Sequence, residues 1–185
     1  MRRLTMLVLS FLLLGAADAR AQEPIESFTA FAASLGTGRS GVVDILVYRW
    51  STDQERESLL TTLQEFGPDR LLDALQKIRP PVGVMRAPGR LGWDLYYGRN
   101  HQNPDGSRRV ALATNRRVSF REAANDTRSM QYQFTLIELH LDARGKGEGK
   151  LVPAAKVTWD HETRRLEIEN YNALPVDLLQ VRVKP

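Results

Sequence analysis

The sequence predicts an α+β fold: an antiparallel β-sheet meander of about six to eight strands, with a helical hairpin from the N-terminal half packed on it. Two observations predict this fold. Helix signals are concentrated between residues 52 and 80, and the chain after residue 92 consists of short apolar and aromatic runs separated by Gly, Pro, Asn and Asp. Runs of that kind are typical of strands joined by turns.

The N-terminus has the features of a secretory signal peptide. Two arginines precede an apolar run from Leu7 to Leu14, and Ala19-Arg20-Ala21 forms a small-residue cleavage site before Gln22. The run is far shorter than the roughly 20 residues of a membrane span, and the sequence contains no cysteine. We therefore expect residues 1–21 to be removed and residues 22–185 to form one globular domain without disulfides. The mature protein is expected to be secreted or periplasmic, with no stable membrane insertion.

The first part of the mature chain is expected to contain a lead-in segment and a central strand. Residues Pro24–Leu35 could form a short helix or an extended lead-in, and the spacing of their apolar residues favours the helix. The sequence Gly36-Thr37-Gly38-Arg39-Ser40-Gly41 has the glycine pattern of a dinucleotide-binding loop, which requires a helix after it. A β-branched and aromatic run, Val42–Trp50, follows instead. We therefore predict a loop at 36–41 and a strand covered on both faces from residue 42.

The helical part is bounded by clear start and stop signals. Thr52 with Glu55 forms a capping box, and apolar residues at helical spacing follow. Gly67-Pro68 interrupts the pattern, and Pro80-Pro81 ends it. Two helical segments joined this tightly predict a helical hairpin or a kinked helix lying on the sheet.

The second half is expected to be a loop, Pro80–Gly92, followed by strands. A hairpin turn is expected at 103–107, a loop at 121–129 and a hairpin tip at 143–150. The strands are expected at Leu91–Gly98, Arg109–Thr114, 118–120, Tyr132–Asp142, Leu151–Trp159, Arg164–Tyr171 and Val176–Val183.

Charge and composition bear on possible partners. Once the signal peptide has left, the 26 basic and 22 acidic residues become 23 and 21, a net charge of +2 spread along the chain. So small a balance gives no reason to expect nucleic acid as a partner. The tip 143–150 resembles a phosphate loop, but Leu151 stands where Ser or Thr must follow the lysine. There is also no Gly-x-Ser-x-Gly elbow, and only three histidines are available to serve a serine.

The strongest candidate site is the run Glu138-Leu139-His140-Leu141-Asp142. Strand alternation places Glu138, His140 and Asp142 on one face. Residues four apart on a strand are about 13 Å apart, too far for all three to hold one ion, so a site would need help from Asp160 or His161. A bulge near Leu136 would change the phase of the strand. The simpler interpretation is a solvent-facing strand end.

Other candidates have structural interpretations. Asp44 is expected to pair with an arginine or to lie at an exposed strand start, and Asp94 is interpreted in the same way. Aromatic residues on strands are expected to be core rather than pocket lining; they are Trp50, Trp93, Tyr96, Tyr97, Tyr132, Phe134 and Trp159.

These patterns lead to a function hypothesis with two alternatives. We expect a non-catalytic binding or accessory protein, without a cofactor or metal, whose partner is a small molecule or another protein. The first alternative is a metal-dependent hydrolase that uses Glu138 and His140. The second is a module that assembles through an exposed strand edge. Arg182, Lys184 and Pro185 weigh against the second alternative, because charges and proline protect an edge at the last strand.

Overall fold

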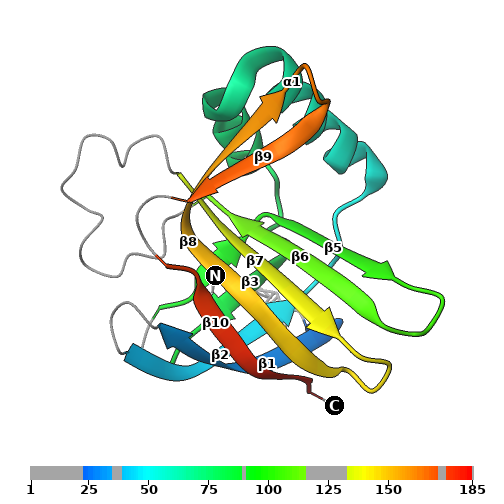
Figure 1. Cartoon of the computed structure of the whole chain (residues 1–185), viewed down its shortest axis with the longest axis vertical. Helices are drawn as coiled ribbons and strands as arrows, with labels where there is room; N and C mark the ends of the chain where they lie inside the picture. Colours follow the sequence, from blue (N-terminus) through cyan, green and yellow to red (C-terminus); the bar gives the residue numbers. More distant parts are fainter. Residues whose placement is uncertain (1–22, 35–38, 89–90, 116–132, 171–173, 185) are drawn as a thin grey trace, which may run out of the picture.

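The computed structural model describes residues 23–34, 39–88, 91–115, 133–170 and 174–184 (Figure 1). One helix and ten strands make up the described chain. They are β1 Glu26–Ser34, β2 Arg39–Val47, α1 Asp53–Gln76, β3 Gly83–Arg86, β4 Trp93–Leu95, β5 Tyr97–Gln102, β6 Arg108–Thr114, β7 Phe134–Leu141, β8 Lys146–Asp160, β9 Arg165–Asn170 and β10 Val176–Val183.

All the strands belong to one antiparallel, barrel-like sheet that is nearly closed. Its order is β4-β3-β2-β1-β10-β8-β7-β6-β5, and β9 pairs with β8 outside this path. The two ends of the order meet because β4 and β5 are consecutive in the chain. The carbonyl of Leu95 accepts from the Val82 amide at 2.8 Å, whereas the next amide, Tyr96, donates to Ala113 of β6 at 2.9 Å. One broken strand therefore joins both ends of the sheet.

Two apolar cores hold this arrangement together. The larger fills the interior of the sheet with side chains from opposite walls, among them Phe28, Ile45, Leu112 and Leu139. The smaller lies outside, where α1 packs on the long strand β8 (Figure 1). Its buried members are Leu59, Leu63, Leu75, Tyr96, Phe134, Ala155 and Val157.

Helix α1 confirms the predicted start and corrects the predicted hairpin. The Thr52 hydroxyl accepts from the Glu55 amide at 3.1 Å, and the Glu55 carboxylate accepts from the Thr52 amide at 2.8 Å, which is the expected capping box. Gly67 leaves helical geometry, with φ 80° and ψ −174°. Pro68 restores it at once, because its fixed φ suits the first turn of a helix. The result is one kinked helix, which was the stated alternative to two helices folded back on each other.

Three segments differ from the predicted elements. Residues 26–34 of the expected helix form β1, in which Phe28, Ala30 and Ser34 alternate inward. The expected loop 80–92 contains β3, whose glycine at position 83 has its Cα so close to Leu46 that a Cβ would lie 2.3 Å from the Leu46 carbonyl oxygen. The last strand, β10, is not an edge, since it pairs with both β1 and β8.

The glycine-rich stretches are partly strands: residues 39–41 and 146–150 lie in strands, whereas residues 143–145 form a turn. Strand β2 begins at Arg39, three residues earlier than expected, and no helix follows Gly41. Strand β8 begins at Lys146, inside the expected tip 143–150. A Cβ on Gly147 would lie 1.8 Å from the His140 carbonyl oxygen, so this position has no room for a side chain.

Several predictions fall outside the described residues. They concern the signal peptide, the strand at 118–120, the loop at 121–129 and the side chain of Tyr132. The expected hairpin turn at 103–107 is present between β5 and β6. Within the described chain, α1 is not apolar enough to cross a membrane.

Candidate functional site

Strand β7 shows the predicted alternation. Ile137, Leu139 and Leu141 are buried, whereas Glu138 is half-buried and His140 is exposed. The pairing of β7 with β8 shifts register between Phe134 and Leu136, where a bulge was expected. Glu138 and His140 therefore lie on the outer wall of the sheet, opposite the core.

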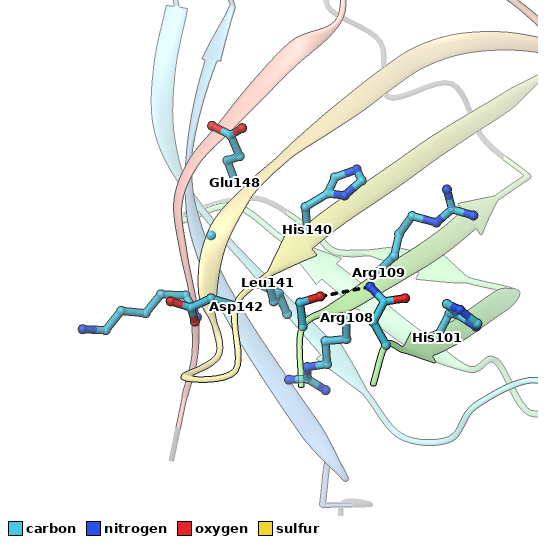
Figure 2. Close-up of a pocket in the computed structure, with 11 residues that line it drawn as sticks. His101, Arg108, Arg109, His140, Leu141, Asp142 and Glu148 are labelled. Atoms are coloured by element: carbon cyan, nitrogen blue, oxygen red, sulfur yellow. Dashed lines mark hydrogen bonds between the residues drawn. The ribbon is translucent and has the colours of Figure 1, made fainter. Parts of the chain in front are cut away.

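Cross-strand register adds residues that the linear sequence does not connect. His101 on β5 lies opposite Arg109 on β6, Arg109 lies opposite His140, and His140 lies opposite Glu148 on β8. We call these four residues the outer row. Arg109 and His140 project from neighbouring strands on the same side of the sheet, and Arg108 points away from them (Figure 2).

Glu138 is the shared acceptor beside this row. Its Oε1 lies 3.4 Å from Nε of Arg109 and 3.3 Å from Nε2 of His140. The Glu138 side chain is 46% exposed, and those of Arg109 and His140 are 60% and 61% exposed. Exposed pairs of this kind stabilise a fold by well under about 1 kcal/mol. These three polar side chains are therefore accessible to a ligand.

Asp142 is held mainly by its own turn. Its Oδ1 accepts from the amides of Arg144 and Lys146, both at 2.9 Å. The hydrogen bond from the Lys146 amide is the main reason that the pKa of Asp142 is below its usual value. Asp105 does the same in the neighbouring turn, where hydrogen bonds from Ser107 lower its pKa. Asp142 is on the predicted face, but its role is to order the turn.

The two turns enclose an open groove of about 690 Å³, which we call the hairpin-tip groove. It lies between the β5–β6 turn, 103–107, and the β7–β8 turn, 142–146 (Figure 2). The turns approach closely, because a Cβ on Gly106 would lie 3.1 Å from Cβ of Ala143. The outer row, together with Lys146 and Asp142, lines the groove.

The part of the chain that the structure describes contains no preformed cluster of metal ligands. No three His, Asp or Glu side chains gather there closely enough to hold an ion. Asp160 lies at the other end of β8, where its carboxylate accepts from the Glu162 amide at 2.8 Å and from the Thr163 hydroxyl. Neither Asp160 nor His161 lines the groove.

The remaining candidates have structural roles. Asp44 pairs with Lys184, rather than an arginine, at 2.7 Å. Asp94 is exposed and lies 3.5 Å from the Tyr96 hydroxyl. Among the described aromatic residues, Tyr96 and Phe134 are buried in the smaller, outer core. Trp50 and Trp93 are partly buried against the larger, inner core, and Tyr97 and Trp159 are partly buried against the outer one.

Sequence reasoning found Glu138 and His140 but missed His101, Arg109 and Lys146. The turn at 103–107 was a usable signal, because it sets Arg109 opposite His101. Nothing local connects β6 to β7, since residues 115–133 separate them. No family model, curated protein or solved structure matches the chain.

Proposed function

We propose that this is an exported, non-catalytic binding or accessory protein that holds the anionic group of a ligand in the hairpin-tip groove. The observation that carries the proposal is the row of His101, Arg109 and His140 on three adjacent strands. Neighbouring strands are about 4.8 Å apart, so the three side chains present N–H groups along roughly 10 Å.

The chemistry of the groove favours a carboxylate or phosphate. A guanidinium binds either group through paired N–H donors, and Arg109 uses its Nε toward Glu138. Lys146, which is exposed at the groove, adds a second cation. The Oδ1 atom of Asp142 is engaged by backbone amides, which reduces its repulsion of an incoming anion.

The contact between Glu138 and His140 also favours the second candidate, a metal-dependent hydrolase. A histidine and a carboxylate 3.3 Å apart could serve as metal ligand and base. Such a site needs a third ligand, and Glu148 is the acidic residue opposite His140. The first candidate function predicts binding of an anion, whereas the second predicts binding of Zn²⁺.

The test is a titration of the protein from Gln22 onward, monitored by amide chemical shifts, with citrate, inorganic phosphate and Zn²⁺ as separate probes. We expect citrate or phosphate to shift the amides of His101, Arg109 and His140. Arg109→Gln should weaken binding about tenfold or more, because a hydrogen bond to a charged group contributes about 1.5–3 kcal/mol. Arg86→Gln, at the one exposed residue of β3, is the matched control and should bind normally.

Two results would contradict the anion proposal. One is an anion affinity that Arg109→Gln leaves unchanged. The other is stoichiometric Zn²⁺ binding that both Glu138→Gln and His140→Gln abolish, which would support the hydrolase instead. The N-terminal residue of protein recovered outside the cytoplasm tests export; we expect Gln22, and Met1 would contradict it.

A further inference from the structure

Strand β9 is an edge of the described sheet. It pairs with β8 and with no other described strand. Its residues from Arg165 to Glu169 are all exposed. Leu166 and Ile168 are 46% and 54% exposed.

The two apolar residues lie on the face that continues the outer core. Leu166 is opposite Trp159, and Ile168 is opposite the buried Val157. Helix α1 packs mainly on β8. The outer core is therefore bordered at β9 by the exposed apolar side chains of Leu166 and Ile168.

Only part of the usual protection of an edge strand is present here. Natural edges carry charged side chains, especially lysine, or a proline or a bulge that prevents pairing with another chain. Strand β9 carries charges at Arg165, Glu167 and Glu169, but it contains neither lysine nor proline, and its register with β8 is regular. Such an edge is suited to accept a strand whose charges match its own.

We propose that β9 pairs antiparallel with β9 of a second copy of this chain, with the two-fold axis at Leu166. Antiparallel pairing about Leu166 places Arg165 of each copy opposite Glu167 of the other. The two ion pairs form on the polar face, and the two Leu166 side chains meet on the apolar face. Within its own chain Glu167 lies opposite the uncharged Thr158, and Arg165 lies opposite Asp160, whose carboxylate accepts from the Glu162 amide and the Thr163 hydroxyl.

Self-complementary charge selects a second copy over an unrelated peptide. A strand with Arg165 and Glu167 on one face has charges that match those of a second copy paired antiparallel to it. An unrelated peptide does not in general carry charges at the matching positions. The pairing continues the sheet over residues 165–167 of each copy and adds cover to Leu166, whereas Ile168 comes opposite Arg164 in the turn before β9. It uses a part of the surface distinct from the hairpin-tip groove, so it stands independently of ligand binding.

The test is sedimentation equilibrium of the protein from Gln22 onward, between about 1 µM and 1 mM. We expect a concentration-dependent dimer for the unmodified chain. Arg165→Glu and Glu167→Arg should each be monomeric, because each places like charges opposite one another across the axis. An equimolar mixture of the two variants should dimerise again, since every cross-axis pair is then of opposite sign.

A matched pair of apolar substitutions provides the control. Leu166→Lys should abolish the dimer, whereas Leu179→Lys on the outer wall, where the side chain is 41% exposed, should leave it intact. Thermal unfolding of each variant verifies that it is folded. A monomer at every concentration would overturn the proposal, as would a dimer that survives both charge reversals. A mixture that stays monomeric would overturn the pairing about Leu166.

Discussion

Glu55 shows how one side chain ties the start of the helix to the sheet. Its carboxylate accepts from the Thr52 amide at 2.8 Å. It also accepts from the two terminal nitrogens of Arg49, both at 2.9 Å. Arg49 Nη2 also donates to the Pro80 carbonyl at 3.1 Å, which lies beyond the other end of α1. The charge of Glu55 therefore holds both flanks of the helix.

We expect Glu55→Gln to lower the free energy of unfolding by about 0.5–1 kcal/mol near neutral pH, because it removes a paired, partly buried charge. The hydrogen bond from Arg49 is the main cause that lowers the pKa of Glu55 below 4.5. Folding therefore favours the ionised form. This contribution is present above the unfolded pKa and is lost as pH falls through the lower folded value.

Urea unfolding at pH 7 and at successively lower pH values measures this effect. The difference between the native chain and Glu55→Gln should shrink below about pH 4.5. Glu57→Gln, on an exposed position of the same helix, is the control and should change stability little. A difference that stays constant down to pH 3 would mean that the charge of Glu55 contributes nothing.

At the residue scale, local sequence pattern predicted interactions between residues a few positions apart, but not interactions between residues distant in sequence. The capping box and the alternation of Glu138 with His140 were both predicted. The partners Arg49 and Arg109 were not, because each meets its carboxylate through tertiary packing or strand pairing. Lys184 reaches Asp44 from the far end of the chain for the same reason.

At the scale of elements, periodicity was ambiguous where small residues carry the pattern. Residues 24–35 have apolar side chains at both helical and alternate spacing, and pairing with β2 and β10 decides for the strand. The alternate glycines of β8 are a second case, in which strand residues were predicted to be a turn. They were expected at a hairpin tip, but Gly147 lies in the strand and is needed there because β7 and β8 are too close together for a side chain.

The kink of α1 gives a prediction at this scale. Gly67 has a backbone conformation that is essentially restricted to glycine. A Cβ there would meet nothing within 4 Å, so steric contact with other residues is not the issue. We expect Gly67→Ala to destabilise the protein by about 1–3 kcal/mol through backbone strain alone.

Gly41→Ala is the matched comparison for Gly67→Ala. Gly41 also has open space around its Cα, but it lies in strand β2 without a positive φ. Alanine there should be neutral or slightly stabilising, because it reduces the entropy of the unfolded chain. Equal effects of the two substitutions, measured by thermal unfolding, would show that the conformation of Gly67 is not strained for alanine.

At the scale of the whole molecule, the antiparallel sheet was predicted and its closure was not. Closure depends on β1 pairing with β10, two strands more than 140 residues apart. Turn chemistry sets the register of hairpins such as β5–β6, but it has no influence on strands so distant in sequence. For this reason β10, a middle strand, was taken for an edge.

Arg108 and Glu26 form an ion pair across the closed sheet. Three strands separate β1 from β6 in the sheet order, so the pair joins opposite walls. The two side chains are only 17% and 15% exposed, and the Arg108 guanidinium lies 5.7 Å from the ring centre of Phe28. Burial makes each charge dependent on the other.

The last prediction follows from that dependence. Arg108→Met should destabilise the fold by about 1–3 kcal/mol, because it leaves the largely buried Glu26 carboxylate without its partner. Adding Glu26→Met should recover most of the loss, since two apolar side chains remove the unpaired charge. Urea unfolding of the two single variants and the double variant measures the coupling. If the double variant is as unstable as the sum of the single variants, the two residues act separately and do not brace the sheet.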